Sequence, residues 1–196
     1  MVLQILALAG YGGFLTAMFG WRTLQAKRAT GDSRWRQPIS RVDAIGETVC
    51  AAGCLLSLMA PPLAMVGAVR PLGPDLPTAQ GIGFAVTLGL GTSLAAWSQR
   101  HLAEQWRAGV EASDTLVTAG PFARVRNPFY LGCFLASASV LAAVPSTLAL
   151  VGLALHIAAA EIIVRGVEEP ILAEAHGAVF SDYRQRTGRF LPRLSA

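Results

Sequence analysis

The segment Leu116–Gly132 reads LVTAGPFARVRNPFYLG, a polar loop that leads directly into a long apolar run. A loop that only connects two helices needs no more than two or three turn-forming residues. Here glycine, proline, arginine, asparagine and tyrosine all occur between positions 120 and 130. We therefore interpret the segment as the core of a binding site that is held at a membrane surface.

The composition predicts an integral membrane protein. Hydrophobic residues make up 53% of the 196 residues and charged residues 14%, and the mean hydropathy is +0.48. An apolar helix of about 20 residues crosses the roughly 30 Å of hydrocarbon in a bilayer. Five segments fit this length: Val2–Gly20, Ala44–Val69, Thr78–Trp97, Phe129–Val144 and Ser146–Val164. The predicted fold is one all-α membrane domain, residues 1–196, with about five transmembrane helices.

The short break at Val144, Pro145 and Ser146 predicts that the fourth and fifth helices form a tight hairpin. After the fifth helix, the tail has apolar residues at helical spacing from Ile171 to Tyr183, with Pro170 at a position that suits a first turn. We expect this segment to be an amphipathic helix on the membrane surface.

The cationic residues indicate the orientation. Fifteen of the sixteen Lys and Arg residues fall in the segments 21–43, 98–128 and 165–196, and Arg70 is the exception. Because Lys and Arg are retained on the cytoplasmic side, we expect the N-terminus outside and the C-terminus in the cytoplasm, in a bacterial-type inner membrane. Topology and membrane lipids explain the net charge of +4, which gives no support for nucleic-acid binding.

Three cysteines lie in the predicted spans, namely Cys50, Cys54 and Cys133. Buried thiols usually pack as small apolar groups. No Cys-x-x-Cys spacing is present, so the sequence predicts no metal site.

Charged and polar groups near or inside the bilayer are costly and call for a partner or a function. Glu168 and Glu169 follow the fifth span, close to Arg165. They either form an interfacial ion pair or turn one carboxylate inward to bind a cationic or polyhydroxylated ligand. His156 and Glu161 lie deeper in the same span. His156 is expected to bond to a neighbouring helix, with substrate binding as the alternative.

Asn127 and Pro128 are typical of a helix start, where asparagine caps and proline fills an early position. Free N–H groups at such a start favour carboxylate or phosphate groups. Together with the arginines before them, Tyr130 one turn later and the acidic cluster at Glu168, they would suit a small zwitterionic cofactor.

The quoted loop resembles a signature of the membrane-embedded isoprenylcysteine carboxyl methyltransferase family, which is related to the phospholipid methyltransferases. EEPIL at residues 168–172 and SDYRQRTGRFLP at residues 181–192 resemble its second signature. The resemblance covers residues 97–193, and it divides the chain into three N-terminal spans with a basic loop, residues 1–97, and a methyltransferase-like core, residues 98–193. Phe122 stands where the family usually has tyrosine, and Asn127 where it has histidine.

The resemblance implies a methyltransferase that uses S-adenosylmethionine and a lipophilic acceptor, a carboxylate, amine or thiol, which enters from the bilayer. Arg165 would be the catalytic or substrate-orienting residue, and Glu169 and His156 are further candidates for substrate binding. The positions that would contact the cofactor are Thr115, Leu116, Val117, Phe122, Asn127, Pro128, Phe129, Tyr130 and Glu168.

Two other functions fit parts of this pattern. Membrane sterol reductases are similar in this half of the chain and bind NADPH, but they are much longer. A non-catalytic membrane partner protein would accommodate the departures at Phe122 and Asn127. The length of the chain favours the methyltransferase over the reductase.

Overall fold

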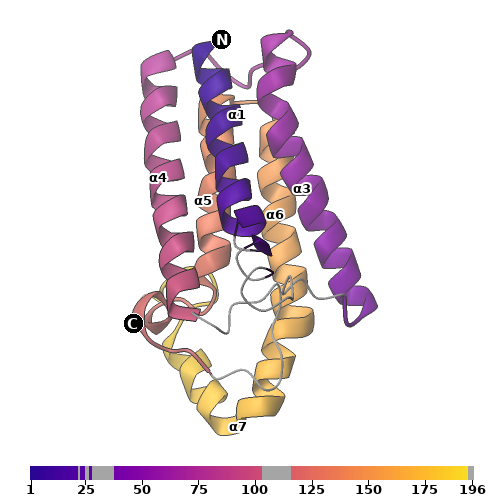
Figure 1. Cartoon of the computed structure of the whole chain (residues 1–196), viewed down its shortest axis with the longest axis vertical. Coiled ribbons are helices and arrows are strands. Elements are labelled where there is room, and N and C mark those ends of the chain that lie inside the picture. The colour runs from indigo at the N-terminus through magenta and orange to yellow at the C-terminus, as the bar shows by residue number, and fades with distance from the viewer. Residues whose placement is uncertain (22, 25–26, 28–37, 103–115, 194–196) are drawn as a thin grey trace.

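The computed structural model describes residues 1–21, 23–24, 27, 38–102 and 116–193. These residues form an all-helical bundle without an extended strand, which confirms the predicted fold class (Figure 1). The elements are α1 (Val2–Leu15), η1 (Thr16–Trp21), α3 (Arg41–Met65), α4 (Pro77–Leu102), η3 (Gly120–Ala123), α5 (Pro128–Ala143), α6 (Thr147–Ile163), η4 (Val164–Glu168) and α7 (Glu169–Arg186).

The five predicted spans coincide with α1 and η1, α3, α4, α5 and α6. Four described helical stretches, Val2–Gly20, Arg41–Met65, Pro77–Leu102 and Thr147–Arg186, are long and apolar enough to cross a membrane, and α5 is apolar but shorter. The last stretch is 40 residues long, about twice what a bilayer requires. Its second part, α7, carries five charged side chains, so the membrane crossing is α6, and α7 lies beyond it.

Local sequence fixes where the helices begin. Ser40 and Ser146 cap α3 and α6, because their hydroxyl oxygens accept hydrogen bonds from the backbone N–H groups of Asp43 and Ala149. Pro128 occupies the first turn of α5, where a backbone N–H would have no hydrogen-bond partner within the helix. The α5–α6 hairpin is as tight as predicted, because α5 ends at Ala143 and α6 begins at Thr147.

The helices pack in pairs, α4 against α5 and α3 against α6, with α1 crossing between them (Figure 1). Of the four glycines of α4, Gly91 lies closest to a neighbouring helix. A β-carbon at Gly91 would lie 2.7 Å from the carbonyl oxygen of Gly132 on α5. A β-carbon at Gly81 or at Gly89 would have no neighbouring side-chain or backbone atom of another helix within 4 Å. Small side chains at this contact let the two backbones touch.

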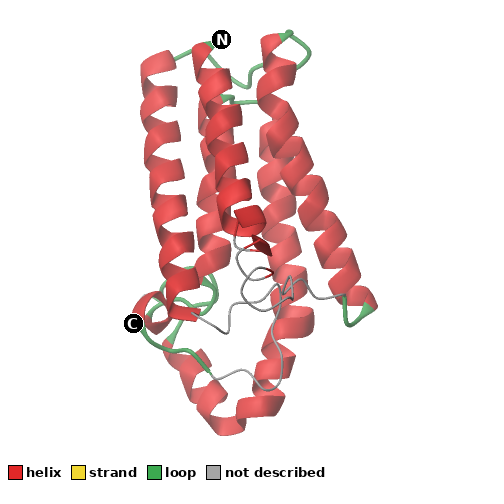
Figure 2. Ribbon diagram, viewed as in Figure 1, coloured by secondary structure: helices red, strands yellow, loops and turns green. Residues whose placement is uncertain are grey.

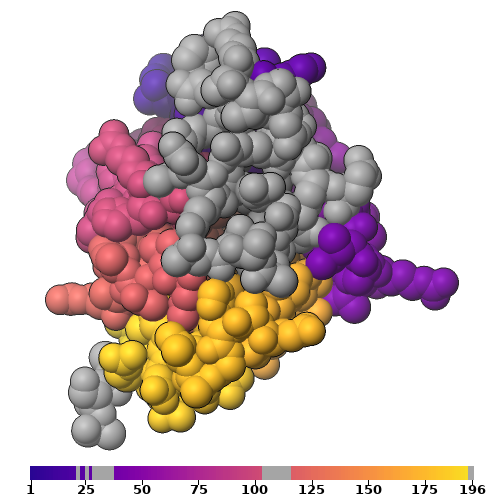
Figure 3. All heavy atoms as spheres, turned by 60° about the horizontal axis from the view of Figure 1, so that its bottom comes forward, coloured from indigo at the N-terminus to yellow at the C-terminus, as the bar shows by residue number. Residues whose placement is uncertain are grey.

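The two ends of the bundle differ in charge. At one end, the loop after α3 meets the α5–α6 turn through a hydrogen bond from Leu72 N to Pro145 O of 2.8 Å, and Arg70 lies in this loop. The other end holds the start of α3, the end of α4, the loop before α5, and α7 (Figures 2 and 3). Those elements, together with η4 and the segment after α7, carry nine of the described cations: Arg41, Arg100, Arg124, Arg126, Arg165, Arg184, Arg186, Arg189 and Arg193.

The tail helix corrects one detail of the prediction. It starts near Pro170 as expected, but the backbone of Gly177 has φ 49°, which breaks the helix there. The apolar stripe therefore does not continue along one face. Val179 is 64% exposed, whereas Phe180 and Tyr183 are 2% and 5% exposed and pack inward.

Candidate active site

The structure brings the two sequence signatures together at the cationic end of the bundle. The hydroxyl group of Tyr130, in the first turn of α5, donates a hydrogen bond of 2.9 Å to Oε1 of Glu168. Glu168 is the last residue of the π-helical turn η4 and is 8% exposed. Single π-helical turns within α-helices are frequent at functional sites. A buried carboxylate with an oriented tyrosine can receive a cation or a hydroxyl group.

The segment after α7 lies along the loop that precedes α5. Backbone N–H groups of Arg126 and Asn127 donate to the carbonyl oxygens of Gly188 and Arg189, at 2.8 and 3.0 Å. The buried hydroxyl group of Tyr183 donates to the carbonyl oxygen of Phe122 at 2.7 Å. The end of the chain thereby holds this loop in place.

Aromatic rings surround Tyr130. The ring of Phe190 lies edge-on to those of Tyr130 and Phe134, with centroids 6.2 and 5.2 Å apart. Phe129 makes a similar contact with Phe19 of η1, at 5.7 Å. Edge-to-face geometry is the favoured arrangement for such rings, and these contacts join η1, α5 and the tail.

An ion-pair network lies beside this aromatic cluster. Both oxygens of Glu169 are bonded: Oε1 accepts from Arg126 and Arg189 at 3.0 Å, and Oε2 accepts from Arg189 at 2.8 Å. Glu161 accepts from Arg189 at 3.2 Å and also pairs with Arg165. The side chains of Arg126 and Glu169 are 9% and 11% exposed. Glu169 therefore joins the loop before α5, through Arg126, to the segment after α7, through Arg189.

Protonation of Glu169 is expected to release this network. Burial raises the pKa of Glu169, but hydrogen bonds and charge from Arg189 and Arg126 outweigh it and hold the pKa below its ordinary value of 4.5. A carboxyl group with a depressed folded-state pKa stabilises the fold above its unfolded pKa, and this stability is lost as the pH falls through the folded value. The melting temperature should therefore be constant above about pH 5 and should decrease as the pH is lowered further.

The Glu169→Gln variant provides the comparison. At pH 7 we expect it to be less stable than the natural protein by about 1.5 kcal/mol, the contribution of a hydrogen bond to a charged group. Melting curves of both proteins in detergent between pH 3 and 7 should converge at the acid end. An equal difference in melting temperature between the two proteins at every pH would contradict this role of Glu169.

The predicted cofactor residues are placed as follows. Phe122 and Pro128 are buried, Phe129 and Tyr130 are half-buried at the start of α5, and Leu116 and Val117 are half-buried in the preceding loop. Thr115 lies outside the described residues.

Asn127 corrects another prediction, because its side chain makes no cap hydrogen bond to α5. Its amide group instead donates to the carbonyl oxygen of Arg189 at 3.3 Å. The residue that was expected to start the helix therefore also fastens the tail to it.

Arg165 lies close to Glu168 in sequence, but the π-helical turn gives the two side chains different environments. The side chain of Arg165 is 63% exposed and bonds to Glu161, whereas Glu168 is buried. Sequence reasoning placed Arg126 near the cofactor and missed Arg189, and it did not show that both bind Glu169. Both belong to the quoted signatures, but the motifs alone did not show which carboxylate they meet.

His156 lies away from this site. Twelve residues separate it from Glu168, which is roughly 18 Å along a helix. It is 6% exposed, and its ring bonds to groups on three other helices, namely Tyr11, Cys54 and Ser137. The sequence left two interpretations of His156, a bond to a neighbouring helix or substrate binding. The structure shows the bonds to neighbouring helices.

Comparison with known protein families gives one match. The family model described as phospholipid methyltransferase matches residues 80–179. The matched part runs from α4 to α7 and includes Tyr130, Glu168 and most of the ion-pair network. No curated protein matches the chain.

Proposed function

The chain belongs to the phospholipid methyltransferase family, and on this basis we propose that it transfers a methyl group from S-adenosylmethionine to a lipophilic acceptor. The matched residues lie in an all-helical membrane bundle, so a bilayer-soluble acceptor would reach the site from the membrane. Within this family, the two signatures favour a type similar to the isoprenylcysteine carboxyl methyltransferases. The methyltransferase core would then comprise residues 98–193.

The observation that carries the proposal is the pairing of Tyr130 with buried Glu168. S-adenosylmethionine has a cationic sulfonium, an ammonium group, ribose hydroxyls and an aromatic base. A carboxylate suits the cationic or hydroxyl groups, and the cluster of Phe129, Tyr130 and Phe190 suits the base. The residues present therefore fit the cofactor. Glu168 and Tyr130 would hold it, together with the loop Leu116–Pro128.

The cofactor supplies an already activated methyl group, so the residues of the site have to position the acceptor and exclude water. Alignment of two reactants contributes about 7 to 11 kcal/mol to lowering a barrier. Arg165 is exposed at the edge of the site and would orient an anionic acceptor, a carboxylate or thiolate. The cationic end of the bundle would face the cytoplasm, which places the site where the cofactor is available.

Arg165 is expected to affect turnover more than cofactor binding. In Arg165→Gln we expect kcat to fall about tenfold, which corresponds to one charge-assisted hydrogen bond to the acceptor. The dissociation constant of S-adenosylmethionine should stay within about twofold, because Glu168 and Tyr130 are unchanged. Arg184→Gln, an exposed change on α7, is the control. Equal losses of turnover and cofactor binding would contradict this division of roles.

The direct test is calorimetric titration of the detergent-purified protein with S-adenosylmethionine and, separately, with NADPH. We expect a dissociation constant on the order of micromolar for S-adenosylmethionine and no measurable binding of NADPH. Transfer of a labelled methyl group to a lipid extract would then identify the acceptor class. Tight binding of NADPH would replace the proposal with a reductase. Cofactor binding without transfer to any extract would leave a non-catalytic protein.

A further inference from the structure

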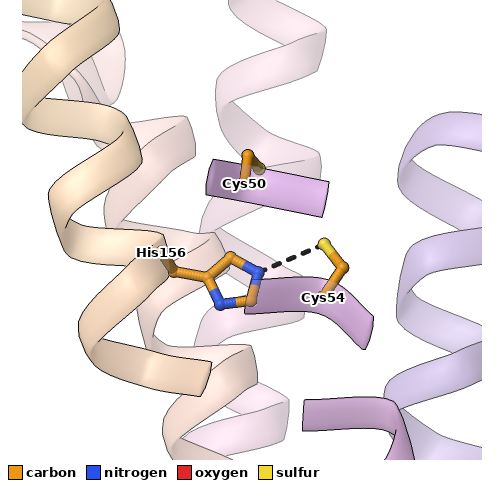
Figure 4. A group of neighbouring side chains, drawn as sticks. All are labelled: Cys50, Cys54 and His156. Atoms are coloured by element: carbon orange, nitrogen blue, oxygen red, sulfur yellow. Dashed lines mark hydrogen bonds between the residues drawn. The ribbon is translucent and has the colours of Figure 1, made fainter. Parts of the chain in front are cut away.

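Two cysteines of α3 and one histidine of α6 form a cluster in the membrane-spanning part of the bundle (Figure 4). Cys50 and Cys54 lie one helical turn apart, and the ring of His156 points toward them from the opposite helix. One ligand atom from each of the three residues lies within 4.8 Å of the other two. The cluster includes α3, which lies outside the residues that match the family.

The hydrogen bonds of His156 fix which ring nitrogen is available to a ligand. Nδ1 lies 2.8 Å from the carbonyl oxygen of Gly152, and a carbonyl group can only accept. Nδ1 therefore carries the proton, and Nε2 presents its lone pair toward Sγ of Cys54, 3.2 Å away. Metal-binding histidines usually donate their second ring N–H to such a carbonyl or carboxylate partner, which sets the tautomer and the ring orientation.

Close packing holds the two helices in register at this level. A β-carbon at Gly53 would lie 3.0 Å from both the carbonyl oxygen of Gly152 and Nδ1 of His156. A β-carbon at Gly152 would lie 2.5 Å from Oγ of Ser57. The position of the imidazole relative to α3 is therefore set by contact of the two backbones, as a preorganised ligand requires.

The distances suit a tetrahedral ion after a small adjustment. With Zn–S bonds of about 2.3 Å and Zn–N bonds of about 2.0 Å, ligand atoms on one zinc are roughly 3.5 to 4 Å apart. The Cys54–His156 pair is already near this range at 3.2 Å. The other separations, none above 4.8 Å, can close by rotation of a cysteine side chain about its single χ angle.

From this geometry we propose that Cys50, Cys54 and His156 bind one Zn²⁺ ion. Thiolate and imidazole ligands select zinc or copper(I) over magnesium and calcium. Two thiolates and a neutral imidazole give a site with no net charge around Zn²⁺, which matters where a net charge in hydrocarbon is costly. Binding releases the two thiol protons. The ion would cross-link α3 and α6, and the hydroxyl group of Tyr11, 3.3 Å from Nε2, would supply the fourth ligand.

The test uses the full chain in detergent, first stripped with a chelator and then loaded with Zn²⁺ or Co²⁺. We expect one Zn²⁺ per chain and, with Co²⁺, the visible absorption of tetrahedral thiolate coordination. Cys50→Ser and Cys54→Ser should each weaken Zn²⁺ binding more than about 100-fold, since loss of a residue that only orients a metal ligand already costs about 10- to 100-fold. Cys133→Ser changes the third cysteine, outside the cluster, and should leave binding unchanged.

A second readout needs no variant. Bound Zn²⁺ should protect Cys50 and Cys54 from alkylation, with no effect on Cys133, as mapped by mass spectrometry of the natural protein. Absence of both stoichiometric Zn²⁺ and thiolate absorption in folded protein would overturn the proposal. Equal protection of all three cysteines, or equal loss of binding in Cys133→Ser, would also overturn it.

Discussion

Glu168→Gln should weaken S-adenosylmethionine binding by about 30-fold or more. Loss of one partner of a buried, hydrogen-bonded charge pair costs about 2 to 5 kcal/mol, and each 1.4 kcal/mol is tenfold in affinity. Glutamine keeps the size of the side chain and can still accept the hydrogen bond from Tyr130, so the change removes mainly the negative charge. Calorimetry of the purified variant gives the dissociation constant directly.

Two further variants make this result specific. Glu174→Gln removes a carboxylate from the exposed face of α7 and should bind the cofactor like the natural protein. Tyr130→Phe keeps the ring but removes the hydrogen bond to Glu168, so an intermediate loss of up to about tenfold is expected. Binding by Glu168→Gln within twofold of the Glu174→Gln variant would exclude Glu168 from the cofactor site.

The fold was accessible from the sequence because its signals are local. Apolar runs of membrane-spanning length located α1, α3, α4, α5 and α6. Pro128 and Ser146 marked helix starts that the structure reproduces. The kink at Gly177 was missed because the helical spacing of apolar residues continues across this glycine in the sequence. In the folded chain its backbone has a positive φ.

The candidate site was only partly accessible. The resemblance named Tyr130 and Glu168, and the structure places them in contact. It did not show that Glu169, the neighbouring carboxylate, would be held by Arg126 and Arg189. That assignment depends on which way two adjacent side chains point after a π-helical turn, and periodicity does not encode it.

The cysteine cluster shows the same limit. A search for ligands close in sequence finds Cys50 and Cys54 at a spacing of four and stops there. The third ligand, His156, is more than a hundred residues away, and the packing of α3 against α6, with Gly53 against Gly152 at this level, brings it near. Helix–helix contact in the membrane thus brings together a cluster that the linear pattern does not indicate.

That kind of contact also governs the stability of the core, and Gly91→Ala should reveal it. A β-carbon there would lie 2.7 Å from the carbonyl oxygen of Gly132 and 2.8 Å from the backbone nitrogen of Ala136. Backbone atoms cannot rotate away, so α4 and α5 must separate. Overpacking of this kind costs about 1 to 3 kcal/mol, and we expect the upper end, a melting temperature lower by roughly 6 to 12 °C.

Gly89→Ala is the matched control in the same helix, because a β-carbon there meets nothing within 4 Å. Alanine is favoured over glycine in a helix by up to about 1 kcal/mol, so this variant should melt at the same temperature or slightly higher. Since α5 carries Tyr130 in its first turn, separation of α4 from α5 should also weaken cofactor binding in Gly91→Ala. Equal melting temperatures for the two variants would show that the contact between Gly91 and Gly132 is not tight, whether or not cofactor binding changes.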